Sequence, residues 1–127
     1  VVEWFPGLGV KEARRRFRAN LEIDGVEAFW EDRLYGDEGE AVRFRIGEVT
    51  FEGVNPCARC VVPARESTTG ESDPDFAAAF IRQRAASLPP WAARSRFDHF
   101  YRLAVNTRLS PVNAGNVVRV GDEVEII

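Results

Sequence analysis

The sequence predicts a mostly β fold, a barrel-like domain with one clear amphipathic helix and several short helical turns. Short stretches alternate apolar and polar residues at the period of a strand, and one segment repeats apolar residues at the spacing of a helix. Turns that carry glycine or proline separate these stretches. We therefore expect six to eight short strands. With 127 residues and 45% apolar content, residues 1–127 are expected to form one domain with a core of ordinary size.

The first half of the chain is predicted to hold a lead-in segment, one strand and one hairpin. Residues 1–10 are apolar but interrupted by proline and glycine, which indicates a strand stub or loop that continues from a preceding segment. Residues 17–24 alternate as a half-buried strand does, and an Asp-Gly turn follows them. Residues 26–34 are too crowded with apolar side chains for a strand and indicate a short helical turn or a loop. Residues 41–46 and 49–54 alternate on either side of Gly-Glu, which predicts a β-hairpin.

The second half is predicted to hold the helix and the remaining strands. Residues 59–62 continue as a strand, and residues 66–75 form a polar, exposed loop. Apolar residues at three-and-four spacing predict a helix over residues 75–87, which the following Pro-Pro ends. We expect a long strand over residues 97–105 and two short strands within residues 117–127.

Composition excludes several classes of protein. The net charge is −3 with a pI near 5.3. Lys11 is the only lysine among 17 basic residues, and the arginines form no clean basic face in the sequence. Both observations argue against nucleic-acid binding. No apolar run is long enough for a membrane span, and the start of the chain does not resemble a secretory signal. Two cysteines suit a reducing, cytoplasmic setting. The absence of methionine indicates a piece of a longer polypeptide.

The chemistry of the chain is expected at Cys57 and Cys60. Arg59 precedes the second thiol, and a guanidinium beside a thiol favours the thiolate, which is the nucleophile and the metal ligand. A thioredoxin-like pair normally opens a helix, whereas a strand is expected here. A closed zinc site needs four ligands, and both cysteines with the single histidine, His99, supply three. The remaining alternative is that both are buried core thiols.

Spacing separates the roles of the two thiols. Pro56 has no N–H and is expected to bring the chain into Cys57 from a turn. Cys57 and Cys60 are an odd number of positions apart, so on a strand their side chains point to opposite faces. A disulfide between them is then difficult, and we expect one working thiol and one packing residue.

Several motifs occur in one order and together resemble a known family. The Arg-Phe-Arg-x-Asn and Cys-x-Arg-Cys segments are the specific ones, and Val-Gly-Asp near the end is common and weak alone. Their order resembles the MOSC domain, named for the C-terminal part of molybdenum cofactor sulfurase, and in particular the subgroup of the mitochondrial amidoxime-reducing component. The match covers nearly the whole chain: Arg14 to Gly25, Trp30 to Asp32, Phe44 to Gly47, Pro56 to Cys60, Thr69 to Glu71, and Val120 to Val124.

The resemblance implies a β-barrel-like domain that binds molybdenum cofactor, a molybdenum-molybdopterin. It makes Cys60 the catalytic thiolate, as ligand to the molybdenum or as carrier of a persulfide sulfur, and leaves Cys57 to packing. Thiolate is a reasonable ligand for a redox metal, and arginine suits an anionic one. The remaining cofactor-binding residues that it implies are Arg18, Asn20, Ala58, Arg59 and Phe100, with Tyr101 as the alternative to Phe100.

Two functional classes follow. The first is a cofactor domain that reduces N-hydroxylated compounds with an electron-donor protein, or carries sulfur from a cysteine-desulfurase-type donor. Related proteins that hold the cofactor tightly have an N-terminal β-barrel domain, so the isolated domain is expected to retain it poorly. The second is a non-catalytic binding module that has kept only the fold. A shared open pocket for Cys60 and Arg18 favours the first class, and a buried Cys60 favours the second.

Overall fold

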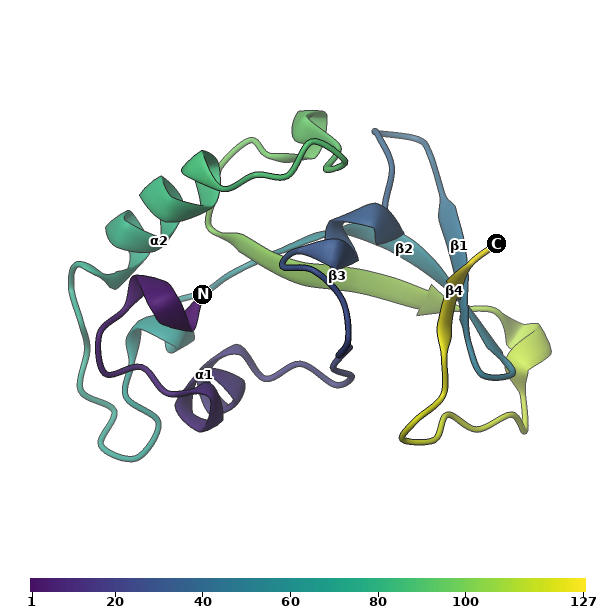
Figure 1. Cartoon of the computed structure of the whole chain (residues 1–127), viewed down its shortest axis with the longest axis horizontal. Coiled ribbons are helices and arrows are strands. Elements are labelled where there is room, and N and C mark those ends of the chain that lie inside the picture. Colours follow the sequence, from purple (N-terminus) through teal and green to yellow (C-terminus); the bar gives the residue numbers. More distant parts are fainter. The chain divides into compact units, whose positions relative to one another are not determined.

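The computed structural model describes the whole chain, Val1–Ile127, and Figure 1 shows its elements. By its internal contacts the chain divides into two compact units, and each is described by itself. Unit 1 comprises Val1–Glu22, Ala58–Leu88 and His99–Leu103, and unit 2 comprises Ile23–Cys57, Pro89–Asp98 and Ala104–Ile127. The elements are the helices α1 (Val10–Phe17) and α2 (Phe76–Ala86), the strands β1 (Val42–Ile46), β2 (Val49–Ala58), β3 (Arg102–Leu109) and β4 (Val124–Ile126), and the 3-10 turns η1 (Val2–Trp4), η2 (Trp30–Leu34), η3 (Val62–Ala64), η4 (Arg94–Arg96) and η5 (Pro111–Asn113).

The strands form one sheet in the order β3-β2-β1-β4 (Figure 1). β1 and β2 make the predicted hairpin, with Val42 opposite Gly53 and Ile46 opposite Val49. Gly47 closes the turn at φ 56°, a conformation that glycine adopts without steric cost. β4 pairs with the other edge of β1, also antiparallel. The hairpin prediction is therefore confirmed.

The core of unit 2 lies on one face of this hairpin. Residues along β1 alternate between exposed and buried, so that Phe44 and Ile46 point inward and their neighbours point outward. Phe44 stacks on Phe51 of β2 with ring centroids 5.3 Å apart. Val49 and Leu34 complete the buried cluster. The alternation seen in the sequence thus identifies the core face of the sheet correctly.

The turn η2, which lies in the segment predicted as a short helical turn or a loop, closes over β1 and β2. It contacts β1, and Leu34 at its end is almost fully buried. Gly53 lies against this turn so closely that a Cβ on it would stand 1.5 Å from the carbonyl oxygen of Leu34. Strand β2 therefore needs glycine, a residue without a side chain, at position 53. The turn is also held by buried Asp32, which accepts a hydrogen bond of 2.8 Å from the hydroxyl of Tyr35.

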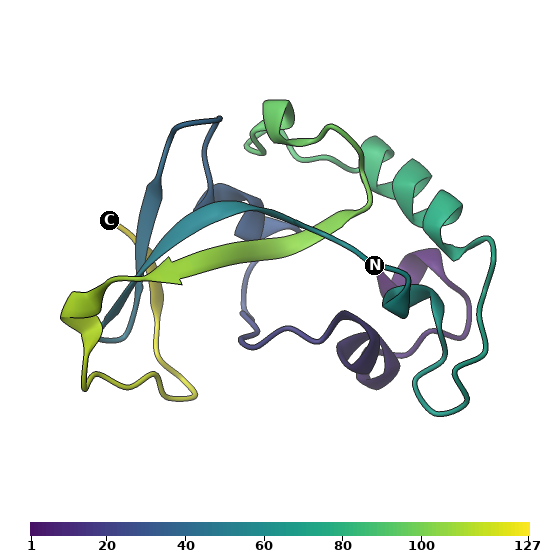
Figure 2. The same cartoon turned by 180° about the vertical axis from the view of Figure 1, so that it is seen from behind.

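Unit 1 is built on the aromatic side chains of α2, and Figure 2 shows the backbone of this helix from behind. Phe76 and Phe80 are buried one helical turn apart. Phe5 stacks on Phe76 at 4.3 Å between centroids, and Phe17 tilts against Phe80 at 5.9 Å. Tyr101 meets Phe80 edge-on at 5.3 Å. Segments far apart in the sequence thereby share one aromatic cluster.

The helix prediction for residues 75–87 is confirmed to within a residue at each end by α2. One detail differs from the apolar stripe that this spacing predicts, because Ile81, one of its apolar residues, is 38% exposed. The third buried position of the stripe is taken by Arg84, whose Nε donates to the carbonyl oxygen of Arg102 at 3.3 Å. A long arginine stem can line a core when its charged end reaches a polar group.

The strand predicted for residues 17–24 is wrong. Helix α1 ends at Phe17, and Arg18 follows in the left-handed conformation with φ 56° and ends it. The preceding Lys-Glu-Ala-Arg-Arg-Arg residues are good helix formers, and Glu12 pairs with Arg16 at 2.7 Å across one turn. The helix therefore takes the first residue of the alternating stretch.

Several predicted strand limits also move, and the sheet is not a closed barrel. Residues 59–62 are not a strand, because β2 ends at Ala58 and η3 follows, with proline in its first turn. Residues 97–101 precede β3, so His99 does not lie on a strand, and β3 extends to Leu109. Only β4 forms within residues 117–127. With four strands, β3 and β4 remain the two edges of an open sheet.

Pro56 lies inside β2, not in a turn before Cys57 as predicted. The register of β1 with β2 ends at Gly53, so beyond that residue β1 offers no hydrogen bond that proline could break. A proline is tolerated where a strand lacks a neighbour on its N–H side.

Candidate functional site

The predicted thiol, Cys60, is exposed directly after β2 in unit 1. The backbone N–H of Arg59, the residue before it, donates to the carbonyl oxygen of Tyr101 at 2.9 Å, which fixes the chain there. Neither Cys60 nor Cys57 forms a disulfide, and Cys57 is half-buried on β2. An exposed thiol on a fixed backbone is open to reagents, whereas the half-buried one is less accessible.

Arg59 ties the end of β2 to the end of α1. Its Nη2 donates to the carbonyl oxygen of Phe17 at 2.5 Å, and its guanidinium lies 5.3 Å from the centre of the Phe17 ring. Its Nη1 donates to the carbonyl oxygen of Leu103 at 3.4 Å. Both terminal nitrogens thus bind main-chain carbonyls, which assigns Arg59 a positioning role. That it also contacts a cofactor stays a prediction.

The same bonds bring the two specific sequence motifs together. Because Arg59 holds the carbonyl of Phe17, the residue before Arg18 and the residue before Cys60 are neighbours in unit 1. Arg18 is exposed, and its guanidinium makes no hydrogen bond or ion pair within the chain. Asn20 is exposed in the bend that follows. Arg18 is therefore a cation available to an anionic group.

Tyr101 supplies a polar atom that the protein leaves unsatisfied. Its hydroxyl is buried without a hydrogen-bond partner. Burial raises the pKa of Tyr101 above its usual value, the negative charge of a Cys60 thiolate raises it further, and the Arg59 guanidinium opposes both. The phenol therefore stays protonated at neutral pH, close enough to Cys60 for their charges to interact. A buried hydroxyl of this kind can donate to a ligand atom or to a water molecule.

Two further predicted residues flank this group. Ala58 is the last residue of β2 and is exposed, and Phe100 is half-buried in the segment before β3. Both belong to unit 1, as do Arg18, Asn20 and Arg59. Their contact with a cofactor stays a prediction.

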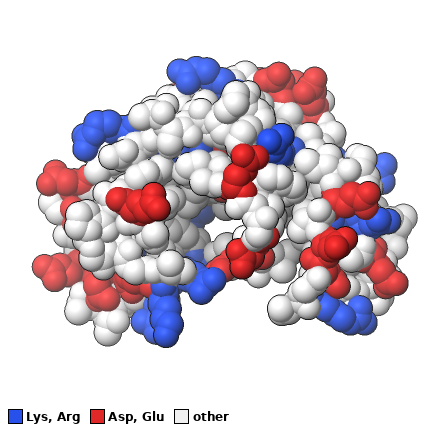
Figure 3. All heavy atoms as spheres, viewed as in Figure 1, with Lys and Arg blue, Asp and Glu red and all other residues white.

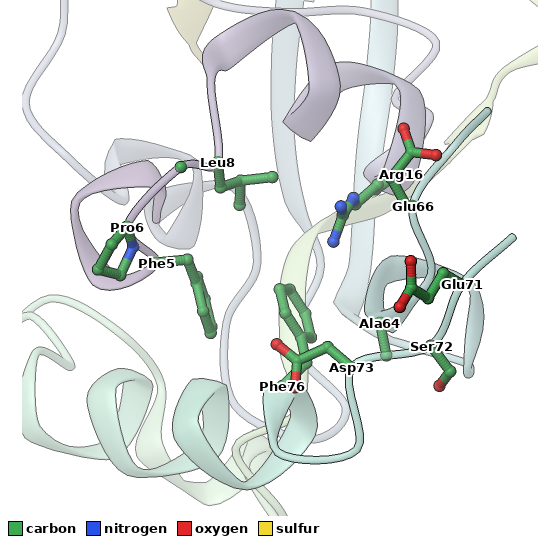
Figure 4. A pocket seen from close by; sticks show the side chains of 11 residues that line it. Phe5, Pro6, Leu8, Arg16, Ala64, Glu66, Glu71, Ser72, Asp73 and Phe76 are labelled. Atoms are coloured by element: carbon green, nitrogen blue, oxygen red, sulfur yellow. The ribbon is translucent and has the colours of Figure 1, made fainter. Parts of the chain in front are cut away.

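A hollow of about 380 Å³ lies elsewhere in unit 1, where the Arg-rich segment meets the Thr-Gly-Glu loop (Figure 4). The side chains of Leu8 and Arg16 point into it, over Phe5 and Phe76. Residues of the loop form the remaining wall, and none of the predicted site residues lines it. The shared open pocket of Cys60 and Arg18 that would favour a cofactor domain is therefore not this hollow.

Hydrogen bonds across α1 and the loop hold this part of unit 1 together. Glu12 accepts from the hydroxyl and the N–H of Ser67, at 2.6 and 2.8 Å. The Ser67 hydroxyl, followed by Arg16, lowers the pKa of Glu12 from 4.5 to about 2. Arg16 also donates to the carbonyl oxygen of Pro63 at 3.4 Å in η3. Helix α1 is thereby connected both to the loop at Ser67 and to η3, the turn that follows Cys60.

No group of three or more His, Cys, Asp or Glu side chains gathers where it could hold a metal ion.

On the face shown in Figure 3, basic side chains are scattered among acidic ones, without an extended patch of one sign. None of the helices has the length and apolar character that a membrane crossing requires.

Comparison of the sequence with models of protein families identifies one family. The model of the MOSC domain matches residues 3–125, and the chain belongs to this family. The family resemblance read from the motifs is confirmed, and the amidoxime-reducing subgroup stays a prediction.

Two curated relatives match part of the chain. Over 67 residues it is 36% identical to molybdenum cofactor sulfurase of Caenorhabditis elegans, which covers 53% of this chain and 8% of that protein. Over 69 residues it is 33% identical to molybdenum cofactor sulfurase of Caenorhabditis briggsae, covering 54% and 9%. The chain therefore spans only a small part of the length of these relatives. No solved structure shows significant similarity to it.

Proposed function

We propose that this MOSC domain binds a molybdenum cofactor and that Cys60 is the thiolate that meets it. The observation that carries the proposal is the exposed thiol of Cys60 beside the buried, unsatisfied hydroxyl of Tyr101. A soft thiolate suits molybdenum, and a protonated phenol can donate to an oxygen or sulfur atom bound there. Arg18 supplies a cation for the anionic part of the ligand. When bound, the cofactor supplies a redox metal centre, and this chain holds and orients it.

We favour a sulfur-transfer role over reduction of N-hydroxylated compounds. Both matched relatives are named molybdenum cofactor sulfurases, which supports sulfur chemistry. In the proposed step the Cys60 thiolate attacks the outer sulfur of a persulfide on a cysteine-desulfurase-type donor. A new S–S bond forms at Cys60, the S–S bond of the donor breaks, and the donor leaves as a thiolate. Exposure of Cys60 supports this role, because the two sulfur atoms must meet at a protein surface.

The oxidoreductase role of the amidoxime-reducing subgroup remains the second candidate. It rests on the order of motifs around Cys60 and Arg18, and it requires an electron-donor protein. In either role we propose a cytoplasmic setting and an N-terminal β-barrel domain that completes the cofactor site. The non-catalytic module is the alternative to both.

The first experiment measures the two chemistries on the same proteins. Wild type, Cys60→Ser and the matched Cys57→Ser are incubated anaerobically with molybdenum cofactor, desalted and assayed for molybdenum. The same three proteins are incubated with a cysteine desulfurase and cysteine and examined by mass spectrometry for an added sulfur. We expect a weak molybdenum signal in the isolated domain and a clear added sulfur, and both should survive Cys57→Ser and disappear in Cys60→Ser.

The outcomes separate the candidates. An added sulfur on Cys60 supports sulfur transfer, and retained molybdenum without an added sulfur supports the oxidoreductase role. Failure of both signals in the wild type, repeated in the presence of the proposed N-terminal β-barrel domain, refutes the proposal and leaves the non-catalytic module. Equal loss in Cys57→Ser and Cys60→Ser refutes the assignment of Cys60.

A further inference from the structure

The solvent face of the hairpin in unit 2 carries an excess of positive charge. Because residues alternate along β1, Arg43 and Arg45 point away from the core that holds Phe44 and Ile46. Arg45 lies opposite Glu125 of β4 and pairs with it at 2.5 Å. The charge of Arg45 is thus already matched by a neighbouring carboxylate.

The charges of Arg43, Glu52 and Arg108, which lie next to one another across β1, β2 and β3, are not balanced in this way. Arg43 lies opposite Glu52 of β2 in the register, yet its guanidinium makes no hydrogen bond or ion pair. Arg108 of β3 approaches the same carboxylate only to 4.0 Å. Two arginines therefore face a single glutamate, which leaves one positive charge in excess. An exposed ion pair of 4.0 Å contributes little, so neither guanidinium is firmly held.

These residues surround a hollow of about 320 Å³. Arg43 on β1 and Arg108 on β3 lie on either side of β2. The spacing of neighbouring strands places these two backbones roughly 10 Å apart, and two long arginine side chains can span that distance around a ligand. Thr50 and Ser110 add two hydroxyl groups, and Leu109 adds an exposed apolar side chain. The lining thus combines two guanidinium groups, hydroxyl donors and one apolar surface.

The wall of the hollow is held in place by a pair of hydrogen bonds. The side-chain amide of Asn113 donates to the carbonyl oxygen of Thr50 at 2.7 Å, and its oxygen accepts from the Thr50 N–H at 3.0 Å. This pair fixes η5, and with it Ser110 and Pro111, against β2. A site whose wall is fixed before binding loses less entropy when a ligand enters.

We propose that this hollow binds a phosphate monoester with a small apolar body. A tetrahedral phosphate offers three oxygens to the guanidinium groups of Arg43 and Arg108 and to the hydroxyl groups, while a carboxylate offers two. The apolar body of the ester covers Leu109. Glu52 acts against the anion, because its carboxylate competes for the same two arginines. This hollow shares no residue with the site around Cys60, so the proposal does not depend on the proposed cofactor chemistry.

The test titrates the full chain with phenyl phosphate, inorganic phosphate and acetate, each at low ionic strength, by isothermal calorimetry. We expect phenyl phosphate to bind more tightly than inorganic phosphate, and acetate to bind weakest. Arg43→Gln and Arg108→Gln each remove a charged donor and should weaken phenyl phosphate binding about tenfold. Glu52→Gln removes the competing carboxylate and should tighten it severalfold.

Arg45→Gln is the matched control. It changes the net charge by the same amount on the same face of the sheet, but Arg45 lies outside the hollow and pairs with Glu125. We expect it, and Cys60→Ser, to leave the affinity unchanged. Absence of binding by the wild type overturns the proposal, as does equal weakening by Arg45→Gln and Arg43→Gln, which indicates non-specific attraction. Inorganic phosphate binding as tightly as phenyl phosphate overturns the assignment to an ester.

Discussion

Replacing Arg59 by lysine separates a positioning role from direct contact with a cofactor. The structure places both terminal nitrogens of Arg59 on main-chain carbonyls, those of Phe17 and Leu103. Lysine keeps the charge but reaches only one of these carbonyls and cannot stack its charge as a plane over the Phe17 ring. If Arg59 is a positioning residue, the substitution destabilises the protein whether or not a ligand is present.

The size of the effect follows from the lost contacts. A hydrogen bond from a charged donor contributes about 1.5–3 kcal/mol, and a cation over an aromatic ring adds about 0.5–1 kcal/mol. The lost bond to Leu103 is long, at 3.4 Å, and the site is half-buried, so we expect a loss of about 1–2 kcal/mol in the free energy of unfolding. For 127 residues, an unfolding entropy of about 2.1 cal/mol/K per residue converts this into a fall in Tm of about 4–8 °C.

The assay is thermal unfolding of the cofactor-free protein, followed by circular dichroism. Arg15→Lys is the control, because Arg15 is exposed on α1 and makes no hydrogen bond or ion pair. We expect that control to leave Tm unchanged. An unchanged Tm in Arg59→Lys, together with a weaker hold on molybdenum cofactor, would show that the guanidinium serves the ligand and not the backbone.

Three other changes test unit 2, the loop contact and the unsatisfied phenol. Gly53→Ala forces a Cβ to within 1.5 Å of the Leu34 carbonyl oxygen and should cost about 3 kcal/mol or more in urea unfolding. The lowered pKa of Glu12 stabilises the folded protein above the unfolded pKa of 4.5, and this stability is lost as the pH falls to about 2. Ser67→Ala should move the NMR titration midpoint of Glu12 up toward 4.5. Tyr101→Phe removes a buried hydroxyl without a partner and should leave stability unchanged or raise it by up to about 1 kcal/mol. Because the folded pKa of Tyr101 is raised, the wild type should lose stability as pH rises above 10.0, and the Phe variant should lose less.

Each of these has a control and a contrary result. Gly9→Ala meets no atom within 4 Å at a negative φ, and because Gly9 is the N-cap of α1 it should cost about 1 kcal/mol, so equal losses at Gly9 and Gly53 would contradict the steric argument. A Glu12 midpoint that stays near 2 in Ser67→Ala would show that Arg16 alone sets it. A loss of more than about 1 kcal/mol in Tyr101→Phe would mean that the hydroxyl has a partner in solution.

The sequence identified the features whose signal is local. The hairpin of β1 and β2 was predictable because alternation marks its buried face and Gly47 supplies the turn. Helix α2 was predictable because a proline pair ends a stretch of helical spacing. The family was predictable because its motifs keep their order along the chain. Cys60 was selected by its motif, and the structure places that thiol at the surface.

Other features were missed because competing local signals were of similar strength. Residues 17–24 alternate like a strand, yet the helix-forming residues before Phe17 carry α1 into that stretch. Pro56 signals a turn, but it is accommodated in β2 because β1 ends opposite Gly53. The number of strands was overestimated for the same reason, since alternation does not show whether an adjacent strand is present to pair with.

The sequence by itself determined the family, the hairpin, the main helix and the choice of Cys60 as the thiol of interest. Only the tertiary structure decided what surrounds that thiol and which charges remain unmatched. Arg59 looks like a ligand-binding arginine in sequence, and its role in positioning appears only when the carbonyl of Phe17 is seen beside it. Likewise, Arg43 and Arg108 are 65 positions apart, and pairing of strands brings them to one hollow. Side-chain chemistry is written in the sequence, but hydrogen-bond partners and burial depend on residues that folding alone makes neighbours.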